Sequence, residues 1–380
     1  MKAAFPHMGY VYVNLGALAR HLGAELCLAP RPSRQSVANG VRHSPEQFCF
    51  PFKANLGDLM ASLDAGAEVL ISVQGAWSCR FGYYGRLHHA ILKDLGYRFE
   101  SLIIDGSRES IEEVAGWVKR VNGCSTAAAV RRFVHGFRVA CKKGKLVQRV
   151  QQRARVLRAV EVQRGSADRT RDRLIERIDA ADEIRALDGL DGEIENAFRA
   201  LPVEMEGARP RIMMVGEVYI VLEPLVNMDA ERRLGEMGSL VDVYIDEHKW
   251  FIHAFRMGKG GKYGERKAHK LATPYLKYNL GGEDKNTIGY TVIASQRGFD
   301  GVAHFKPFTC MPEGMAKHIL YNVSRDHDIP FVSFTVDEHS GEAGFETRLE
   351  AFVEMLRQRA GREASRRGGV ASARGSGVPV

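Results

Sequence analysis

The stretch that organises this chain runs from Ser44 to Gly85 and reads SPEQFCFPFKANLGDLMASLDAGAEVLISVQGAWSCRFGYYG. Between its two cysteines, Cys49 and Cys79, the segment 56–73 has the pattern of a helix followed by a buried strand. Each cysteine therefore lies where the chain turns between elements, and two turns at one edge of a sheet can face each other. Proline, glycine and aromatic residues crowd both turns. They restrict the backbone and exclude water, as a site built from soft thiolate ligands requires.

Outward from this stretch, short apolar runs alternate with amphipathic ones. In the first part of the chain, strands are expected at 3–5, 24–29, 68–73 and 99–104, and helices at 11–22, 56–65 and 84–95, with a further helix beginning at Ser33. This alternation predicts a parallel sheet with helices on its faces. Ligands of such sheets bind beyond the carboxyl ends of the strands, which is where the Cys79 turn should lie.

The remainder of the chain divides into a helical stretch and a second alternation. Residues 110–201 have almost no strand pattern, whereas strands are expected again at 211–215, 241–245, 301–305 and 331–336; residues 291–294 fit a helix or a poor strand. The predicted fold class is α/β, with two Rossmann-like parallel-sheet domains and a helical middle segment. The expected boundaries are 1–108 for the N-terminal α/β domain, 109–208 for the helical middle segment, 209–360 for the C-terminal α/β domain and 361–380 for a disordered Gly/Arg/Ser-rich tail.

Size and composition are those of an ordinary globular protein with two or three domains. The chain has 380 residues, of which 45% are hydrophobic and 26% charged. It has no run of about 18 apolar residues and no apolar core of a secretory signal near Met1, so we expect no membrane span and a cytoplasmic location.

The net charge of +8 is unevenly spread. Residues 131–173 hold 14 Lys/Arg against 3 Asp/Glu, and residues 357–380 hold 6 Arg against 1 Glu. A basic stripe can bind nucleic acid, but this one follows helical periodicity and lacks interleaved aromatic residues. A solvated helix face, or a docking surface for an acidic partner, is therefore the preferred interpretation.

The six cysteines have no small-domain spacing, which favours free thiols or metal ligands over a disulfide scaffold. Cys310 matches Cys49 and Cys79 in context, because it follows an expected strand and precedes a helix. A helix N-terminus should favour the thiolate form that binds metal. Without a CxxC pair there is no zinc-ribbon or ferredoxin pattern, so the residues alone leave open a shared metal site or separate reduced cysteines. Of the other three, Cys27 and Cys124 are interpreted as packing residues. Cys141 is followed by Lys142 and Lys143, which could acidify its thiol, but an unreactive cysteine is the preferred interpretation.

Further side chains could take part in a site at these turns. The candidate acid/base groups or fourth ligands are Glu46, Glu217, Glu313 and His339, although a helix cap or a local hydrogen bond is the preferred interpretation of each one. Arg80 and Lys53 lie next to cysteines and could offset negative charge there, or they could pair with surface carboxylates. His7 and Tyr83 are expected beside the cleft in structural roles. The glycine-rich loop at 258–262 lacks the GxxxxGK[ST] order and a preceding strand, so it is expected to be a mobile loop and not a nucleotide site.

Several motifs in order give the chain a resemblance to a known family. They are FPHMG at 5–9, SPE at 44–46, CFPFK at 49–53, CRFGYY at 79–84, GE at 216–217, CMPE at 310–313 and DEHSGE at 337–342. The chain resembles the 2-hydroxyacyl-CoA dehydratase component family, in its activase-related branch of CoA-protein activases. The resemblance covers nearly the whole chain outside the tail and the middle helices. It implies two Rossmann-like domains around a helical one, and a [4Fe-4S] cluster held by three cysteines with one iron open, at the positions of Cys49, Cys79 and Cys310.

This chain departs from the family at one position. Many relatives read Cys-Gly-Pro-Cys before the Arg-Phe-Gly, and here the first of those cysteines is replaced by Ala76. The replacement removes an extra thiolate and puts a bridged double-cluster arrangement in doubt.

The function that the resemblance implies is the handling of low-potential electrons. In dehydrating relatives, a separate activator ATPase with its own cluster supplies one electron, and the open iron binds the thioester carbonyl of an acyl-CoA. The implied activity is that of a 2-hydroxyacyl-CoA dehydratase-like lyase component or an ATP-dependent reductase component, with a related second subunit as a further partner. Two alternatives remain: a non-catalytic cluster-bearing electron relay or scaffold, and a zinc-binding or metal-free regulatory module.

Overall fold

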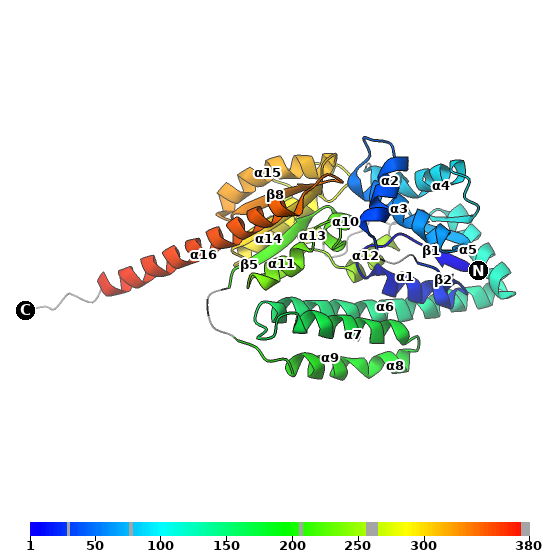
Figure 1. Ribbon diagram of the computed structural model, residues 1–380, viewed down its shortest axis with the longest axis horizontal. Coiled ribbons are helices and arrows are strands. Elements are labelled where there is room, and N and C mark those ends of the chain that lie inside the picture. The colour runs from blue at the N-terminus through cyan, green and yellow to red at the C-terminus, as the bar shows by residue number, and fades with distance from the viewer. Residues whose placement is uncertain (29–30, 76–78, 205–206, 208, 256–264, 374–380) are drawn as a thin grey trace, which may run out of the picture.

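Two four-stranded, all-parallel sheets form the framework of the protein, described here by a computed structural model (Figure 1). The structure describes residues 1–380 except 29–30, 76–78, 205–206, 208, 256–264 and 374–380, and only the backbone of residues 363–373. Ala76 and the loop at 258–262 therefore lie outside the described residues. The prediction of an α/β fold with two Rossmann-like parallel sheets is confirmed.

Both sheets have the same strand order. The N-terminal sheet runs β2-β1-β3-β4, with β1 at Lys2–Ala4, β2 at Glu25–Leu26, β3 at Val69–Val73 and β4 at Glu100–Ile104. The C-terminal sheet runs β6-β5-β7-β8, with β5 at Arg211–Gly216, β6 at Leu240–Val243, β7 at Gly301–Pro307 and β8 at Phe331–Val336. In each sheet the strand order reverses between the first and the third strand. The carboxyl edge at such a switch point is where open α/β sheets bind ligands, so β1/β3 and β5/β7 mark two places for a site.

Helices cover both faces of the N-terminal sheet. They are α1 (Val11–His21), α2 (Arg34–His43), α3 (Phe50–Asp64), the short 3-10 helix η1 (Arg80–Tyr83), α4 (Tyr84–Asp94) and α5 (Arg108–Asn122). Val69 packs into a core with Trp117 of α5, whereas its neighbour Leu70 packs with Leu59 of α3. This division follows from the alternation of side chains along a strand.

The start of α3 differs from the prediction of a helix at 56–65. The helix begins at Phe50, and Pro51 lies in its first turn. Proline is tolerated in this turn, because the backbone N–H groups there have no acceptor within the helix and the N–H that proline lacks is not needed. Cys49 is consequently the N-cap residue of α3.

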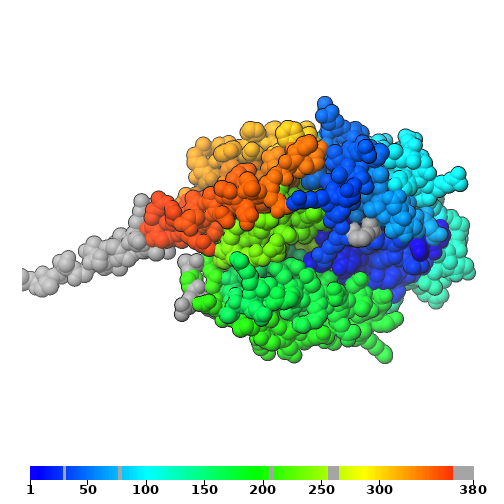
Figure 2. All heavy atoms as spheres, viewed as in Figure 1, coloured from blue at the N-terminus to red at the C-terminus, as the bar shows by residue number. Residues whose placement is uncertain are grey.

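The helical segment lies beneath both sheets in Figure 1 and consists of α6 (Thr126–Arg158), α7 (Ser166–Ala180), α8 (Ile184–Asp188) and α9 (Leu190–Arg199). The long helix α6 packs on α1 of the N-terminal part and on β6 of the C-terminal part. The space-filling view shows the three parts in contact, with the helical segment in green (Figure 2). One buried carboxylate joins all three, because Glu247 accepts hydrogen bonds from the Tyr10 amide at 3.1 Å and from Gln151 Nε2 at 2.7 Å.

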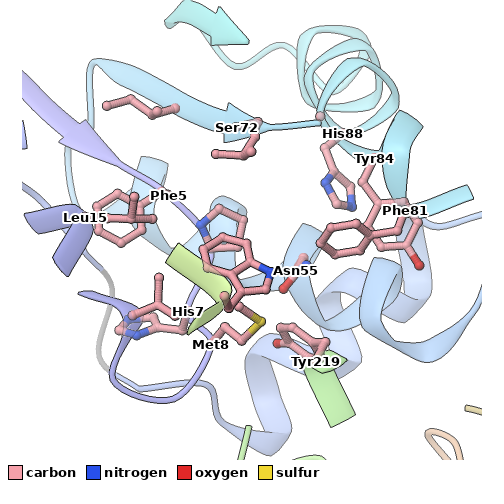
Figure 3. Close-up of a pocket in the computed structure, with 16 residues that line it drawn as sticks. Phe5, His7, Met8, Leu15, Asn55, Ser72, Phe81, Tyr84, His88 and Tyr219 are labelled. Carbon is pink, nitrogen blue, oxygen red and sulfur yellow. The ribbon is translucent and has the colours of Figure 1, made fainter. Parts of the chain in front are cut away.

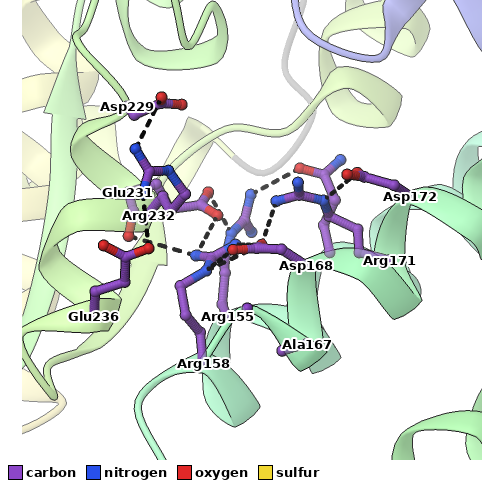
Figure 4. Close-up of polar contacts among 12 residues, drawn as sticks. Arg155, Arg158, Ala167, Asp168, Arg171, Asp172, Asp229, Glu231, Arg232 and Glu236 are labelled. Carbon is purple, nitrogen blue, oxygen red and sulfur yellow. Dashed lines mark hydrogen bonds and ion pairs between the residues drawn. The ribbon is translucent and has the colours of Figure 1, made fainter. Parts of the chain in front are cut away.

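Many basic side chains of the helical segment pair within the chain. Arg155 Nε binds Glu231 at 2.7 Å, and Arg158 Nη2 binds Asp168 at 2.5 Å (Figure 4). The charge of this segment is therefore partly neutralised by intrachain ion pairs, and Arg155 and Arg158 are buried, so they do not belong to the solvated helix face that was expected.

The C-terminal sheet carries α10 (Val218–Leu222), α11 (Ala230–Glu236), α12 (Glu247–Ala254), α13 (Glu265–Ala272), α14 (Asp284–Gln296), α15 (Met311–His327) and α16 (Glu342–Ala373). Residues 291–294, left open between helix and strand, belong to the helix α14. Five apolar side chains of α16 join the core of this sheet, namely Phe345, Leu349, Phe352, Val353 and Leu356.

The helix α16 continues to Ala373 and so includes residues 361–373, the first part of the tail for which disorder was expected. Alanine and arginine each occur three times in this stretch, and both residues favour an established helix. Residues 374–380 of the expected tail lie outside the described part. No helix among the described residues is both long and apolar enough to cross a membrane.

Candidate functional site

Each of the three candidate cysteines is the N-cap residue of a helix. Cys49 caps α3, Cys79 caps η1 after β3, and Cys310 caps α15 after β7. The last two therefore lie at the carboxyl edges of the two sheets, and Cys310 follows a strand of the β5/β7 switch point. We refer to these three residues as the cysteine site.

Arg80 ties the three cysteine turns together. Its guanidinium Nη1 donates to the carbonyl of Gln47 at 2.9 Å, and its Nη2 donates to the carbonyl of Thr309 at 3.0 Å. Arg80 itself follows Cys79, Gln47 lies two residues before Cys49, and Thr309 directly precedes Cys310. One side chain thus joins segments separated by 33 and 229 positions in the chain. The structure brings the three turns together between the two sheets.

Burial raises the pKa of all three thiols, to about 11 for Cys79. Neighbouring acidic groups add to this effect. Glu217 raises the pKa of each of the three thiols, Cys49 raises the pKa of Cys79, and Cys79 raises the pKa of Cys310. The expectation that helix N-termini would favour thiolates is therefore wrong for the metal-free protein, because desolvation outweighs the helix dipole. The thiols are protonated at neutral pH, and metal binding would have to release their protons.

An aromatic wall shields the sulfur of Cys49. The hydroxyl of Tyr84 is hydrogen-bonded to Cys49 Sγ, and the Tyr84 ring lies 5.1 Å from that of Phe52 in an edge-on arrangement. Both aromatic residues are buried. Phe48 extends the wall, with the Arg80 guanidinium 5.3 Å from the centre of its ring.

Of the four candidate acid/base residues, the structure places two beside the cysteine site. Glu46 and His339 are exposed. Glu217 and Glu313 act electrostatically on Cys310, and burial raises the pKa of each carboxyl to about 8. Both carboxyls are consequently largely protonated at neutral pH.

The surroundings of the two glutamates differ. Glu217 caps α10 by accepting a hydrogen bond from the Ile220 amide at 2.9 Å. Glu313 Oε2 lies 3.0 Å from Thr287 Oγ1 and 2.8 Å from His304 Nε2, while its Oε1 has no hydrogen-bond partner. Burial lowers the pKa of His304 to about 3, so this imidazole is neutral. Glu313 therefore carries its proton in a neutral, buried pair.

Sequence reasoning missed a third acid of this group. Burial raises the pKa of Glu283 to about 7, and the charges of Glu265 and Glu313 add to the effect. Glu283 belongs to the turn before α14 and is part of no motif that could have identified it. With Glu217 and Glu313 it forms a set of proton-holding carboxyls near the end of β5 and the start of α15.

The two basic candidates behave differently. Lys53 is buried and pairs with Glu338, so its charge is already compensated. Arg80 has no carboxylate partner among the described side chains and binds carbonyls instead. It opposes the burial effect on the pKa of Cys49 and Cys79. Arg80 is therefore the cation that can respond to negative charge at the cysteine site.

The remaining residues singled out from the sequence lie in structural positions. His7 donates its backbone amide to Asp58 Oδ2 at 2.6 Å, and Tyr83 is 64% exposed. Cys27 Sγ contacts the carbonyl of Ala65 at 3.4 Å, on the far side of α3 from its N-cap. Cys124 and Cys141 pack against the core shared by α1, α5 and α6.

A cavity of about 60 Å³ lies next to the cysteine site, at the β1/β3 switch point (Figure 3). Its wall includes the segment Phe5–Met8 after β1, the end of β3, and side chains of α3, α4 and α10. Tyr84, which contacts Cys49, and Phe81, which follows Cys79 by two positions, also line it. The cavity and the cysteine site thus share a wall.

A second cavity, of about 100 Å³, lies between α6, α7 and β6 and is lined by five arginines, namely Arg31, Arg155, Arg158, Arg171 and Arg232. All but Arg31 form ion pairs with nearby carboxylates (Figure 4). Arg31 stacks on Tyr10, 5.6 Å from the ring centre. The positive charge of this cavity is therefore largely compensated.

Among the described residues, no three His, Cys, Asp or Glu side chains are grouped closely enough to bind a single metal ion. No known family model matches the chain, and no curated protein matches its sequence.

Proposed function

We propose that the chain is a [4Fe-4S] protein that resembles a 2-hydroxyacyl-CoA dehydratase component and accepts low-potential electrons from a separate ATP-dependent activator. Cys49, Cys79 and Cys310 would hold the cluster. The observation that carries the proposal is the bridge made by Arg80, which joins the three cysteine turns across two sheets.

The donor set suits such a cluster in kind and in number. Iron–sulfur clusters are held by cysteine thiolates, each on a different iron atom, so the ligands need not converge on one point as they do for a single ion. Three cysteines leave one iron open. Buried Cys49, half-buried Cys79 and Cys310, and the aromatic wall provide the shielded setting that tunes a cluster's potential.

Arg80 and Tyr84 are the residues of this chain that would adjust the site. The Tyr84 hydroxyl is hydrogen-bonded to Cys49 Sγ and would donate to it once the sulfur is a thiolate ligand; hydrogen bonds to ligand sulfur raise the reduction potential of a cluster. Arg80 compensates negative charge from its position between the turns. When bound, the cluster would supply one-electron chemistry and an open iron as a Lewis acid.

Glu217 is the acid best placed to hold and release a proton at the site. It acts electrostatically on all three thiols, and its pKa of about 8 keeps it largely protonated at neutral pH. A general acid works best when its pKa lies near the working pH. We therefore assign Glu217 as the candidate proton donor for a leaving hydroxyl group, with Glu313 as its buried neighbour.

The test begins with purification under strictly anaerobic conditions. We expect a brown protein with absorbance near about 400 nm and about four iron and four sulfide per chain. Changing Cys49, Cys79 or Cys310 singly to serine should abolish or strongly reduce iron retention, whereas Cys27→Ser and Cys124→Ser, the matched controls, should retain it. Full iron content in the three serine variants, or bound zinc in place of iron, would refute the proposal.

A second measurement separates a catalytic component from an electron relay. Acyl-CoA turnover is assayed with an activator, ATP and a reductant, for the wild-type protein and for Glu217→Gln. A catalytic component should turn over, and the variant should lose most of that activity while keeping its iron. A cluster that is reduced without turnover would identify a relay or scaffold.

A further inference from the structure

The long helix α6 is strongly basic, and its charge is compensated over only part of its length. Its residues 126–158 include ten Lys/Arg and no Asp or Glu. Six of the ten form ion pairs with carboxylates of other segments, namely Lys142, Lys143, Arg149, Arg153, Arg155 and Arg158. In the view of Figure 1 the N-terminal end of α6 extends beyond α7 and α9. Intrachain pairing therefore accounts for the charge near the C-terminal end of α6 and not for the rest.

Three of the other basic side chains form one line along α6. Arg131, Arg138 and Lys145 are exposed and have no carboxylate partner within the part of the chain that the structure describes. The fourth, Arg132, donates to the carbonyl of His21 at 3.3 Å. A spacing of seven residues is close to two helical turns. The three unpaired cations therefore lie on the same face of the helix.

Apolar side chains are exposed beside these cations. Val130 is 56% exposed and Val134 is 51% exposed. Val134 follows Arg131 by three residues and precedes Arg138 by four, and residues at these spacings are neighbours on a helix surface. We call Val130, Arg131, Val134, Arg138 and Lys145 the α6 face.

The C-terminal part of α6 shows what such a surface binds. The helix α9 packs on it, with Ile194 buried in the core that it shares with α6. Beside this contact, Asp191 of α9 pairs with Arg149 at 2.5 Å, and Glu195 pairs with Arg153 at 2.5 Å. An acidic amphipathic helix thus already covers one part of α6, where it buries apolar side chains and neutralises arginines.

We propose that the α6 face is a docking site for an acidic amphipathic helix of another protein. Such a helix would lie along α6, cover Val130 and Val134 with its apolar stripe, and place carboxylates beside the three cations, as α9 does further along. A membrane surface fits less well, because interfacial helices insert a row of Trp, Phe or Leu and this face offers two valines. Single-stranded nucleic acid requires aromatic side chains for base stacking, and the α6 face has none.

Binding is measured on the full-length protein by fluorescence anisotropy with a labelled synthetic peptide. The peptide is an alanine-rich helix of about 20 residues with leucine on one face and glutamate on its borders, long enough to span the α6 face. The comparison peptides are a scrambled one of the same composition and one with lysine in place of glutamate. We expect micromolar binding of the first peptide, at least about tenfold weaker binding of the other two, and a loss of affinity as salt is raised to about 0.15 M.

Charge reversal tests the basic part of the face. The triple variant Arg131→Glu, Arg138→Glu and Lys145→Glu should weaken binding of the acidic peptide at least about tenfold, because it replaces three attractions by repulsions. The control reverses three exposed basic residues of α13, with the same change in net charge: Arg266→Glu, Lys267→Glu and Lys270→Glu. This control should bind within about twofold of the wild type, because charges away from the bound peptide are screened by salt.

A second pair of variants tests the apolar part. Val130→Ser combined with Val134→Ser should weaken binding by about 3- to 10-fold, because two half-exposed side chains would no longer be buried by the peptide. The control is Val156→Ser on the same helix, since Val156 is 53% exposed and lies outside the α6 face. This control should bind the peptide as the wild type does.

Anionic lipid vesicles and a single-stranded oligonucleotide are measured beside the peptide. Tighter binding of either one, lost in the α6 triple variant, would refute a helical protein partner in favour of that class. An equal loss of peptide binding in the α13 control would reduce the effect to net charge and overturn the proposal, as would undiminished binding of the scrambled peptide. None of these measurements depends on iron, so their outcome and that of the proposed function are independent.

Discussion

The close crossing of α2 and α3 makes Gly57→Ala the most decisive test of the architecture that positions Cys49. A Cβ on Gly57 would lie 1.8 Å from the carbonyl oxygen of Ser36, and one on Gly40 would lie 1.9 Å from the carbonyl oxygen of Lys53. Both obstacles are backbone atoms, which no rotamer change can move. Since real Cβ contacts stay beyond about 3.0 Å, the helices would have to separate by about 1.2 Å.

This separation sets the expected cost. Overpacking of a core typically costs about 1–3 kcal/mol, whereas replacing a helical glycine by alanine gains about 1 kcal/mol of helix propensity. The obstacle here is backbone on both helices, so we expect Gly57→Ala to lower the free energy of unfolding by about 2 kcal/mol or more. Because α3 begins at Cys49, the same displacement should also reduce iron retention.

The assay is chemical denaturation followed by far-UV circular dichroism, with iron content measured in parallel. The matched control is Gly116→Ala, also within a helix, where a Cβ would meet nothing within 4 Å. This variant should keep its midpoint or raise it. If Gly57→Ala were as stable as Gly116→Ala, the close packing of α2 on α3 would be wrong, and with it the placement of Cys49.

Two further predictions concern the surroundings of the cysteine site. Arg80→Gln should accelerate iron loss to a chelator several-fold, because Arg80 joins the three turns, and should change the unfolding midpoint little, because Arg80 is exposed. The control is Arg86→Gln, since Arg86 is also exposed. Equal rates of iron loss in the two variants would contradict the bridging role of Arg80. Glu313 gives a pH dependence: its pKa is raised from 4.5 to about 8, so the folded state holds a proton that the unfolded state has released, and stability should fall as pH rises from about 4.5 to 8. The pKa of buried His304 is lowered to about 3, so this residue makes stability rise with pH below about pH 6.5. The fall in stability caused by Glu313 should therefore be clearest between about pH 6.5 and 8, and Glu313→Gln should flatten it. Denaturation midpoints across this range test the prediction, and an unchanged slope in the variant would contradict it.

The sheet framework was predictable because its signals are local. Each strand of the N-terminal sheet is a short apolar run, and Gly66 and Gly96, both with positive φ, end the helices between them. The start of α3 was placed six residues late, because Pro51 resembles a helix breaker until its place in the first turn is known. The continuation of α16 was missed because composition alone suggested disorder.

The candidate site was predictable only in part. The contexts of Cys49, Cys79 and Cys310 after turns and before helices are visible in the sequence, but the N-cap position of Cys49 was not, because the helix after it was expected to begin at residue 56. The direction of the pKa shifts of these thiols could not be predicted from the sequence, because their burial depends on how two distant sheets meet. Glu283 was missed for the same reason: its raised pKa depends on burial and on Glu313, which lies 30 positions away in the chain.

The bridge made by Arg80 has a consequence for how the protein matures. Two of the three sulfurs and the arginine itself come from the first 80 residues, whereas the third sulfur arrives only with residue 310. A ribosome-bound or truncated N-terminal part would therefore present an incomplete set of ligands, however well it folds. Loading of the proposed cluster would therefore be a late event that follows docking of the two sheets, and the proteins that deliver iron and sulfide would encounter a nearly finished molecule.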